Sequence, residues 1–308
     1  MPEILPAVAP VFLLILLGHG LRRFGLLGEA FWDGAERLTY FVLLPALLLS
    51  TLAEASLGGL TVLPMAAAIV ATILAGAVLL ILLRRVFAVE GAAFTSLFQG
   101  ALRQNTYIGL ALAATLFGPM GLGAAALAVA LTVPLVNLLS VAALARHGSQ
   151  ADPSLPGTLK KILRNPLILA CLLGIAVNQA GLGLPPVIDP LIAILGRGAL
   201  PLGLLAVGAG LRLATGAGDS RADGRDLALA CGLKLALMPV LAALACWGFG
   251  ASGVAASVAV LFNALPAATS SYILARQLGG DAPLMARIIT LQTALSIGSL
   301  PLVLILLT

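Results

Sequence analysis

A polar stretch within a long apolar segment holds the side chains best able to bind a ligand. It runs from Gln99 to Gly109 and includes Arg103, Asn105, Thr106 and Tyr107. In a membrane-spanning helix, Arg103 and Asn105 would lie roughly 16 to 20 Å from the basic end, near the bilayer centre. A charged side chain at that depth costs about 2.5 to 3.5 kcal/mol and faces a cavity or a partner. Arg103 therefore either contacts an anion or satisfies carbonyl oxygens at a helix break.

A second polar stretch runs from Asn263 to Tyr272 and contains Pro266 and Thr269. Pro266 has no N–H and clashes with the preceding turn, so it predicts either an interrupted helix or a simple kink. Two broken helices would direct the partial positive charge of their N-termini at an anion, and Asn105 either caps one of them or binds a carboxylate. The candidate ligand-binding residues are Arg103, Asn105, Thr106, Tyr107, Asn263, Pro266 and Thr269, and the candidate helix-break residues are Gly109 and Pro266.

The elements that must position these residues are membrane-spanning helices. Of the 308 residues, 61% are hydrophobic and 9% are charged, which leaves too few charges to cover a water-facing surface. The long apolar runs differ from the short alternating strands of a β-barrel. We predict an all-α integral membrane protein surrounded by a lipid bilayer, with about ten spans near 5–21, 33–53, 61–83, 92–117, 121–145, 160–180, 187–211, 226–248, 252–276 and 284–306.

Basic residues gather at alternate ends of these segments. The connections 54–60, 118–120, 181–186 and 249–251 contain no Lys or Arg, whereas the other connections are flanked by arginines or lysines. By the positive-inside rule both termini face outward, and the expected location is a bacterial inner membrane. Because the basic residues are explained by orientation in the bilayer, a nucleic-acid partner is not expected.

The two halves of the sequence resemble each other. A shift of 156 positions places Pro10-Val11-Phe12-Leu13 on Pro166-Leu167-Ile168-Leu169, and a shift of 164 places Leu97-Phe98-Gln99 on Leu261-Phe262-Asn263. Five spans in each half is an odd number, so the second half would enter the membrane from the opposite side. We predict a first repeat over 1–148, a cytoplasmic linker over 149–159 and a second, inverted repeat over 160–308.

Groups that catalysis would need are missing from the sequence. It contains no Gly-rich phosphate loop, no His-Glu-x-x-His pattern and no cluster of Cys and His. We therefore predict no metal, no cofactor and no enzymatic activity. Carboxylates such as Glu36 fall near segment ends, so a buried acid pair is not expected, although coupling to a proton or sodium gradient stays open.

Two other polar features lie inside predicted spans. Lys234 is about two turns from a basic end, and its ammonium group is expected to reach water by snorkelling. A polar stripe in the last span favours hydrogen bonding between helices and comprises Thr290, Gln292, Thr293, Ser296 and Ser299.

Four stretches of the chain resemble a known family: Leu44–Leu48, Arg103–Leu110, Leu200–Leu204 and Leu265–Asp281. The family is that of the auxin efflux carriers, which includes bacterial members and the plant PIN-formed carriers. The resemblance implies ten helices in two inverted five-helix repeats with crossing broken helices 4 and 9, similar to bile-acid symporters and sodium/proton antiporters. It also implies a homodimer through helices 1, 2, 6 and 7. In plant members an Asn and a crossover Pro contact a carboxylate, and the matching residues here are Asn105 and Pro266.

The resulting hypothesis is a transporter, secondary active or facilitative, that moves a small organic anion by elevator-like alternating access. Unlike the plant members, this chain has no Pro between Thr106 and Leu110 and no long cytoplasmic loop. The resemblance to bacterial members therefore favours small carboxylates such as malate or malonate over auxin. Two alternatives stay open, a non-transporting membrane scaffold or sensor and an anion channel.

Overall fold

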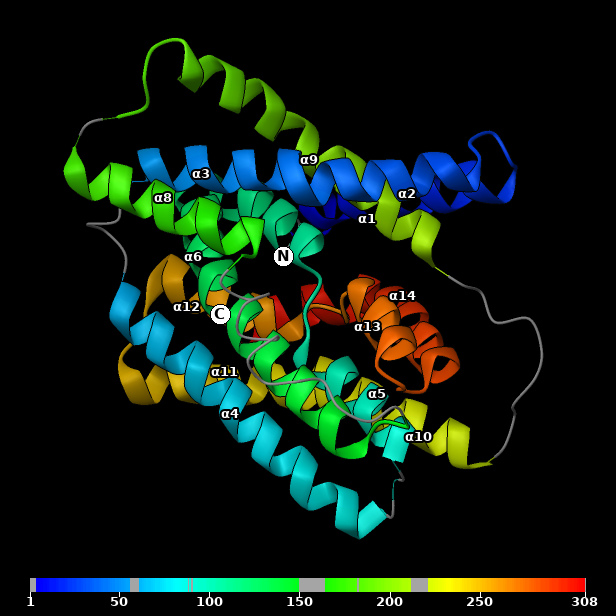
Figure 1. Ribbon diagram of the computed structural model, residues 1–308. Helices are drawn as coiled ribbons and strands as arrows, with labels where there is room; N and C mark the ends of the chain where they lie inside the picture. The colour runs from blue at the N-terminus through cyan, green and yellow to red at the C-terminus, as the bar shows by residue number, and fades with distance from the viewer. Residues whose placement is uncertain are drawn as a thin grey trace.

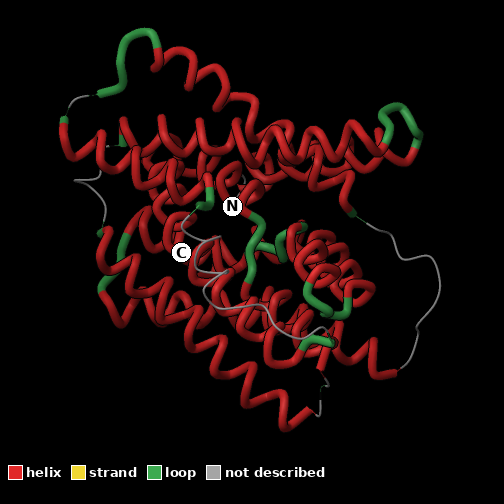
Figure 2. Tube along the Cα trace, viewed as in Figure 1, coloured by secondary structure: helices red, strands yellow, loops and turns green. Residues whose placement is uncertain are grey.

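The described part of the chain is helical. The computed structural model describes residues 4–55, 61–87, 89, 91–149, 164–181, 183–211 and 221–307, and these ranges contain no β-strand (Figure 2). By length and composition, seven helical stretches among them can cross a membrane, and two shorter apolar helices accompany them. The prediction of an all-helical chain with membrane spans is confirmed for these residues.

Helices from both halves of the chain form an upper bundle in the view of Figure 1. Within it α1 packs on α9, and α3 packs on α8 and α9. The upper bundle comprises α1 (Ile4–Arg23), α2 (Glu29–Leu38), η1 (Thr39–Leu43), α3 (Leu44–Glu54), α8 (Pro166–Ala180) and α9 (Ile188–Gly210).

The remaining helices form a lower bundle, and α6 contacts both bundles. The lower bundle comprises α4 (Val62–Phe87), α5 (Gly91–Leu102), α6 (Thr106–His147), α10 (Arg221–Gly232), η3 (Leu233–Leu237), α11 (Met238–Phe249), α12 (Gly253–Ala264), α13 (Ser270–Gln277) and α14 (Ala282–Leu307). Helix α6 bends at Gly118, whose φ of 61° favours glycine. This bend separates the predicted spans 92–117 and 121–145.

Two short π-helices each precede a proline. In η1 the N–H of Leu44 donates to the carbonyl of Thr39, and Pro45 follows. In η3 the N–H of Met238 donates to the carbonyl of Leu233, and Pro239 follows. Because a proline has no N–H to donate and its ring clashes with the preceding turn, a local widening of the helix accommodates it. Thus α2 to α3 and α10 to α11 each continue as one helical stretch.

The predicted boundaries agree with the helices to within a few residues in most places. The second predicted span began at residue 33, whereas α2 begins at Glu29. Helix α8 begins at Pro166, and residues 160–163 of the predicted sixth span lie outside the described residues. The predicted linker 149–159 also lies outside them, except for Ser149. The division into two repeats at this linker stays a prediction.

Two glycines bring α1 and α9 into close backbone contact. A Cβ atom at Gly18 would collide with the backbone of Leu205, and one at Gly208 would collide with the carbonyl of Ile15. Each glycine therefore lies against the main chain of the opposite helix. Such small residues allow helices to pack closely in a membrane, where apolar burial provides little net attraction.

Replacing Gly208→Ala should force α1 and α9 apart. Overpacking of this kind costs roughly 1 to 3 kcal/mol, so the apparent melting temperature in detergent should fall. The matched control is Gly298→Ala on α14, where an added Cβ meets no atom within 4 Å. Equal melting temperatures for the two variants would contradict the proposed close contact.

Candidate functional site

Two helix interruptions meet inside the lower bundle. One covers residues 103–105 between α5 and α6, and the other covers 265–269 between α12 and α13. The N–H of Asn105 donates to the carbonyl of Pro266 at 2.9 Å. One main-chain hydrogen bond therefore joins the two interruptions, and the breaks lie side by side.

Gln292 on α14 supports the second interruption. Its Oε1 accepts from the N–H of Ala267 at 2.9 Å, and its Nε2 donates to the carbonyls of Gly100 and Ala230 at 3.2 and 3.0 Å. This single amide links α14, α5, α10 and the break. Three other residues of the polar stripe predicted in the last span donate hydrogen bonds within α14 instead. The hydroxyl groups of Thr290, Thr293 and Ser296 donate to carbonyls of their own helix.

Asn105 caps the N-terminus of α6. Its Oδ1 accepts from the N–H of Ile108 at 3.3 Å, and the residue is 1% exposed. Its Nδ2 is buried and has no hydrogen-bond partner among the described residues. Capping therefore uses the amide oxygen and leaves the two amide hydrogens for another acceptor.

Arg103 is a buried cation held by neutral groups. Its Nη1 donates to Oδ1 of Asn137 at 2.6 Å, and its Nη2 donates to Oγ of Ser270 at 3.1 Å. Its Nε is buried without a partner, and no carboxylate pairs with it within the part of the chain that the structure describes. The guanidinium therefore links the first break to the N-terminus of α13 while keeping its full positive charge.

A small cavity of about 60 Å³, the crossing cavity, lies where the two helix interruptions meet the upper bundle. The N-termini of α6 and α13 both line it, so two positive helix ends converge on it. Its lining residues are Glu36, Tyr40, Leu44, Asn105, Thr106, Tyr107, Leu167, Ala268, Thr269 and Ser270.

The structure brings together some of the residues that the sequence singled out and separates others. Asn105, Thr106, Tyr107 and Thr269 line the crossing cavity, and Pro266 lies in the break beside it. Asn263 does not line the cavity. It is buried within α12, and its Nδ2 donates to the carbonyl of Ala259 on the same helix.

Gly109 does not break a helix, which corrects the sequence prediction. It lies in the first turns of α6, after an interruption that ends at Asn105. A Cβ at this position would come within 2.7 Å of Leu265 and 3.0 Å of Phe262. The glycine therefore leaves room for the ends of the Leu265 and Phe262 side chains.

One other sequence interpretation is also corrected. Lys234 does not snorkel, since it is 1% exposed within η3. Glu36 lies near the end of α2, as expected, and it lines the crossing cavity from there. Tyr40 and Ser270, both missed, line the cavity as well, and the hydroxyl of Tyr40 accepts from Nδ2 of Asn165 at 3.0 Å. The polar face of residues 29–40 was the signal that could have revealed Glu36 and Tyr40.

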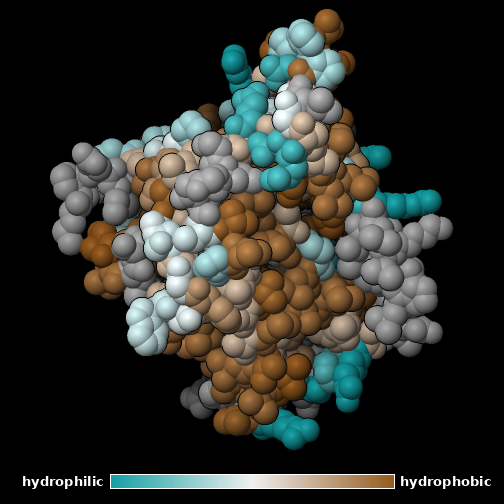
Figure 3. Space-filling view, turned by 90° about the vertical axis from the view of Figure 1, so that its left-hand side faces the viewer, coloured by the Kyte–Doolittle hydropathy of each residue, from teal (hydrophilic) through white to brown (hydrophobic). Residues whose placement is uncertain are grey.

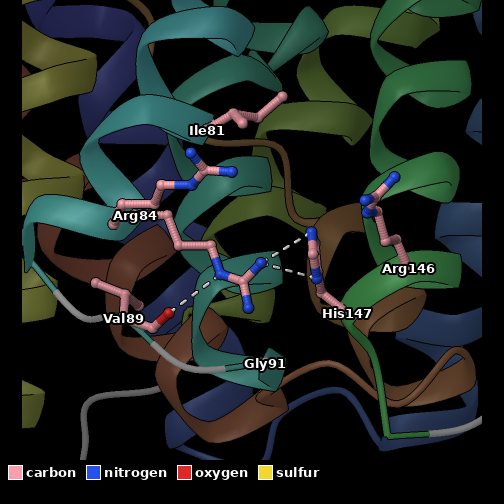
Figure 4. Close-up of a pocket in the computed structure, with 7 residues that line it drawn as sticks. Ile81, Arg84, Val89, Gly91, Arg146 and His147 are labelled. Atoms are coloured by element: carbon pink, nitrogen blue, oxygen red, sulfur yellow. Dashed lines mark hydrogen bonds between the residues drawn. The ribbon is translucent and has the colours of Figure 1, made fainter.

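A second cavity of about 230 Å³, the vestibule, adjoins the crossing cavity and shares the lining residues Glu36 and Thr269 with it. Arg22 and Arg276 line this vestibule, which therefore lies on a side that carries basic connections. Another cavity, of about 340 Å³, lies at connections that contain no basic residue, and it is lined by Glu54, Pro119 and, from α9, Arg197. A cavity of about 820 Å³ lies elsewhere, between the ends of α4 and α6 (Figure 4).

Residues 152–304 match the family described as membrane transport protein. The chain is also 28% identical over 298 residues to an uncharacterized transporter of Methanothermobacter thermautotrophicus, covering 96% of this chain and 95% of that protein. The chain is similar to membrane transport proteins. Its apolar helices agree with that likeness, and it is a multi-pass membrane protein.

Gln292→Leu should destabilise the region where the two helix interruptions meet. The N–H of Ala267 would lose its acceptor while staying buried, which costs about 1 to 3 kcal/mol. The control Thr293→Val is on the same helix and equally buried, but its hydroxyl donates only to its own helix. Thermal unfolding in detergent should show a lower melting temperature for Gln292→Leu than for the control. The reverse order would show that Gln292 does not support the break.

Proposed function

We propose that this protein is a secondary carrier for a small organic anion, with a carboxylate as the substrate class. One observation carries the proposal: two helix N-termini and a free amide donor converge on one cavity. Asn105 has an unused Nδ2, and Arg103, which lies in the adjoining helix break, has no acidic hydrogen-bond partner among the described residues. An anion would accept from the unused donors, and it would share the cavity with the carboxylate of Glu36.

Carboxylate chemistry fits the donors that line the crossing cavity. The first N–H groups of an α-helix have no acceptor within that helix. Oδ1 of Asn105 already accepts from the N–H of Ile108. The N–H groups of Thr106 and Tyr107, at the start of α6, are then the donors left for a ligand. The hydroxyl groups of Thr269 and Ser270 belong to the other helix start. Oxygen atoms of one carboxylate can accept from such groups on both helices.

Transport requires the site to open. The crossing cavity of about 60 Å³ has room for only about two water molecules, at about 30 Å³ each. The vestibule on the side of Arg22 and Arg276 is the proposed entry route, since it shares lining residues with the crossing cavity. Movement of the lower bundle along the upper bundle would then open the site toward the cavity near Glu54, as in an elevator.

The order of the helices supports a finer architectural proposal. When α6 is divided at the bend at Gly118 and each pair of helices joined by a break is counted as one, the described helices form ten successive segments, of which the fourth and ninth are interrupted. We propose two inverted repeats of the auxin efflux carrier type, both termini outside a bacterial inner membrane, and a homodimer formed through the upper bundle. Exposed apolar side chains on α1 and α9, including Leu13 and Ile194, are consistent with a lipid or subunit contact there.

Asn105→Ala should weaken transport without unfolding the protein. Loss of a hydrogen bond to a charged group costs about 1.5 to 3 kcal/mol, so the apparent KM for malonate should rise about tenfold or more in proteoliposomes. Thr106→Val should also reduce uptake, whereas Thr115→Val is the matched control on the same helix, because its hydroxyl donates to Ala111. Unchanged saturable uptake by Asn105→Ala would exclude the site. Flux that never saturates would favour an anion channel, and neither flux nor binding would favour a scaffold.

Glu36 offers a coupling group for the anion. Its carboxylate lines both the crossing cavity and the vestibule, so an entering anion meets a like charge unless Glu36 carries a proton. We propose that a proton is taken up with the substrate at this residue. The other titratable and charged groups that line the same two cavities are Glu29 and Asp33 on α2, Arg22 on α1, Tyr40 on η1, Tyr107 on α6, and Tyr272 and Arg276 on α13.

Uptake should therefore increase as the pH falls through the titration of Glu36. In Glu36→Gln the side chain is neutral at every pH, so this increase should be flattened. Glu29→Gln provides the control, since it removes a carboxylate from the same helix that lines only the vestibule. Initial uptake rates in proteoliposomes across a pH series would measure the effect. A pH profile of Glu36→Gln that coincides with that of the unmodified protein would rule out this role.

A further inference from the structure

A large basic groove lies between the ends of two helices, away from the crossing cavity. Arg84 and Arg85 come from the last turn of α4, and Arg146 and His147 come from the last turn of α6. Together with Ile81, Val89 and Gly91 they line a cavity of about 820 Å³. Figure 4 shows the side chains of Arg84 and His147 directed toward each other across this groove.

Arg84 is held in place without a carboxylate. Its Nη1 lies 3.0 and 3.1 Å from the two ring nitrogens of His147, and its Nε donates to the carbonyl of Val89 at 3.3 Å. The guanidinium carbon is 5.1 Å from the centre of the Phe94 ring, a cation–π distance. Arg84 therefore has a defined position, whereas Arg85 and Arg146 are exposed beside it.

The groove has a surplus of positive charge. No Asp or Glu lines it among the described residues. Glu90, which is outside those residues, neighbours Val89 and Gly91 in the sequence, but one carboxylate cannot balance three guanidinium groups. Two helix C-termini with their partial negative charge favour the arginines but carry no full charge. A ligand with an anionic group would complete the site.

Apolar surface adjoins this groove. On the last turns of α4, Ile81, Leu82 and Val86 are 54%, 57% and 74% exposed. The space-filling view in Figure 3 shows extensive apolar surface on one side of the molecule, with hydrophilic residues toward its margins. A ligand bound at the arginines could thus place hydrocarbon chains along α4. Free inorganic phosphate would use only the charged half of this arrangement.

We propose that this groove binds the phosphate group of an anionic phospholipid, with the acyl chains lying along the exposed apolar face of α4. Clusters of basic side chains at the cytoplasmic ends of membrane helices attract anionic lipid head groups, with about 1 kcal/mol for each Lys or Arg near the surface. The proposal is independent of the transported substrate, because no residue of the groove lines the crossing cavity or the vestibule.

The test uses the purified full-length protein in a neutral detergent. Melting temperatures are measured with added phosphatidylglycerol, with phosphatidylcholine of the same acyl chains, and with water-soluble glycerol phosphate. A lipid that binds the folded state raises the melting temperature. We expect phosphatidylglycerol to give the largest increase. Equal effects of the two lipids would overturn the proposal, and so would an equal effect of glycerol phosphate, which would assign the groove to soluble phosphates.

Variants then locate the effect. The double variant Arg85→Gln/Arg146→Gln should lose about tenfold or more of its preference for phosphatidylglycerol, measured as bound lipid by native mass spectrometry. The double variant Arg37→Gln/Arg197→Gln removes the same charge at exposed positions outside the groove and should keep the preference. Arg85→Lys/Arg146→Lys retains both positive charges and should therefore retain the preference for phosphatidylglycerol. This variant keeps the test decisive if the glutamine variant fails to fold. Equal losses in all three variants would overturn the proposed location.

Discussion

Pairing of the main chain inside a hydrocarbon layer is the constraint on which this structure depends. Two helices are interrupted at the same place, and an unpaired N–H or C=O in lipid costs several kcal/mol. The hydrogen bond from the N–H of Asn105 to the carbonyl of Pro266 pairs one interruption with the other. Gln292 pairs the N–H of Ala267, and Asn105 Oδ1 pairs that of Ile108. Each break is therefore completed by side chains or by the main chain of the other break, which replace the hydrogen bonds of a continuous helix.

Polarity at the crossing follows from this pairing. A broken helix must begin again, and each new start carries partial positive charge. Here the N-termini of α6 and α13 line one cavity. Nη2 of Arg103 donates to Oγ of Ser270, the first residue of α13. Glu36 enters the same cavity from the upper bundle. The combination places two helix N-termini and a carboxylate within one small space, and the proposed coupled transport rests on that arrangement.

The two bundles differ in how their contacts are made. In the upper bundle, Gly18 and Gly208 bring the main chains of α1 and α9 together, which leaves little freedom for one helix to slide on the other. In the lower bundle, Gln292 ties α5, α10 and α14 to the break. Motion between the bundles would then conserve both sets of internal contacts. The basic groove at the ends of α4 and α6 belongs to the bundle that would move.

The sequence by itself determined the membrane class, most helix boundaries and the positions of the polar interruptions, because hydropathy and the missing N–H of Pro266 act within one stretch of chain. Only the tertiary structure decided which side chains share the cavity. Asn263 turned out to bond to its own helix, and Gly109 serves a contact with Leu265 and Phe262. Glu36 reached the site from a helix whose sequence placed it near an end. These outcomes depend on which faces of separate helices meet, and residue spacing along a single helix does not specify that.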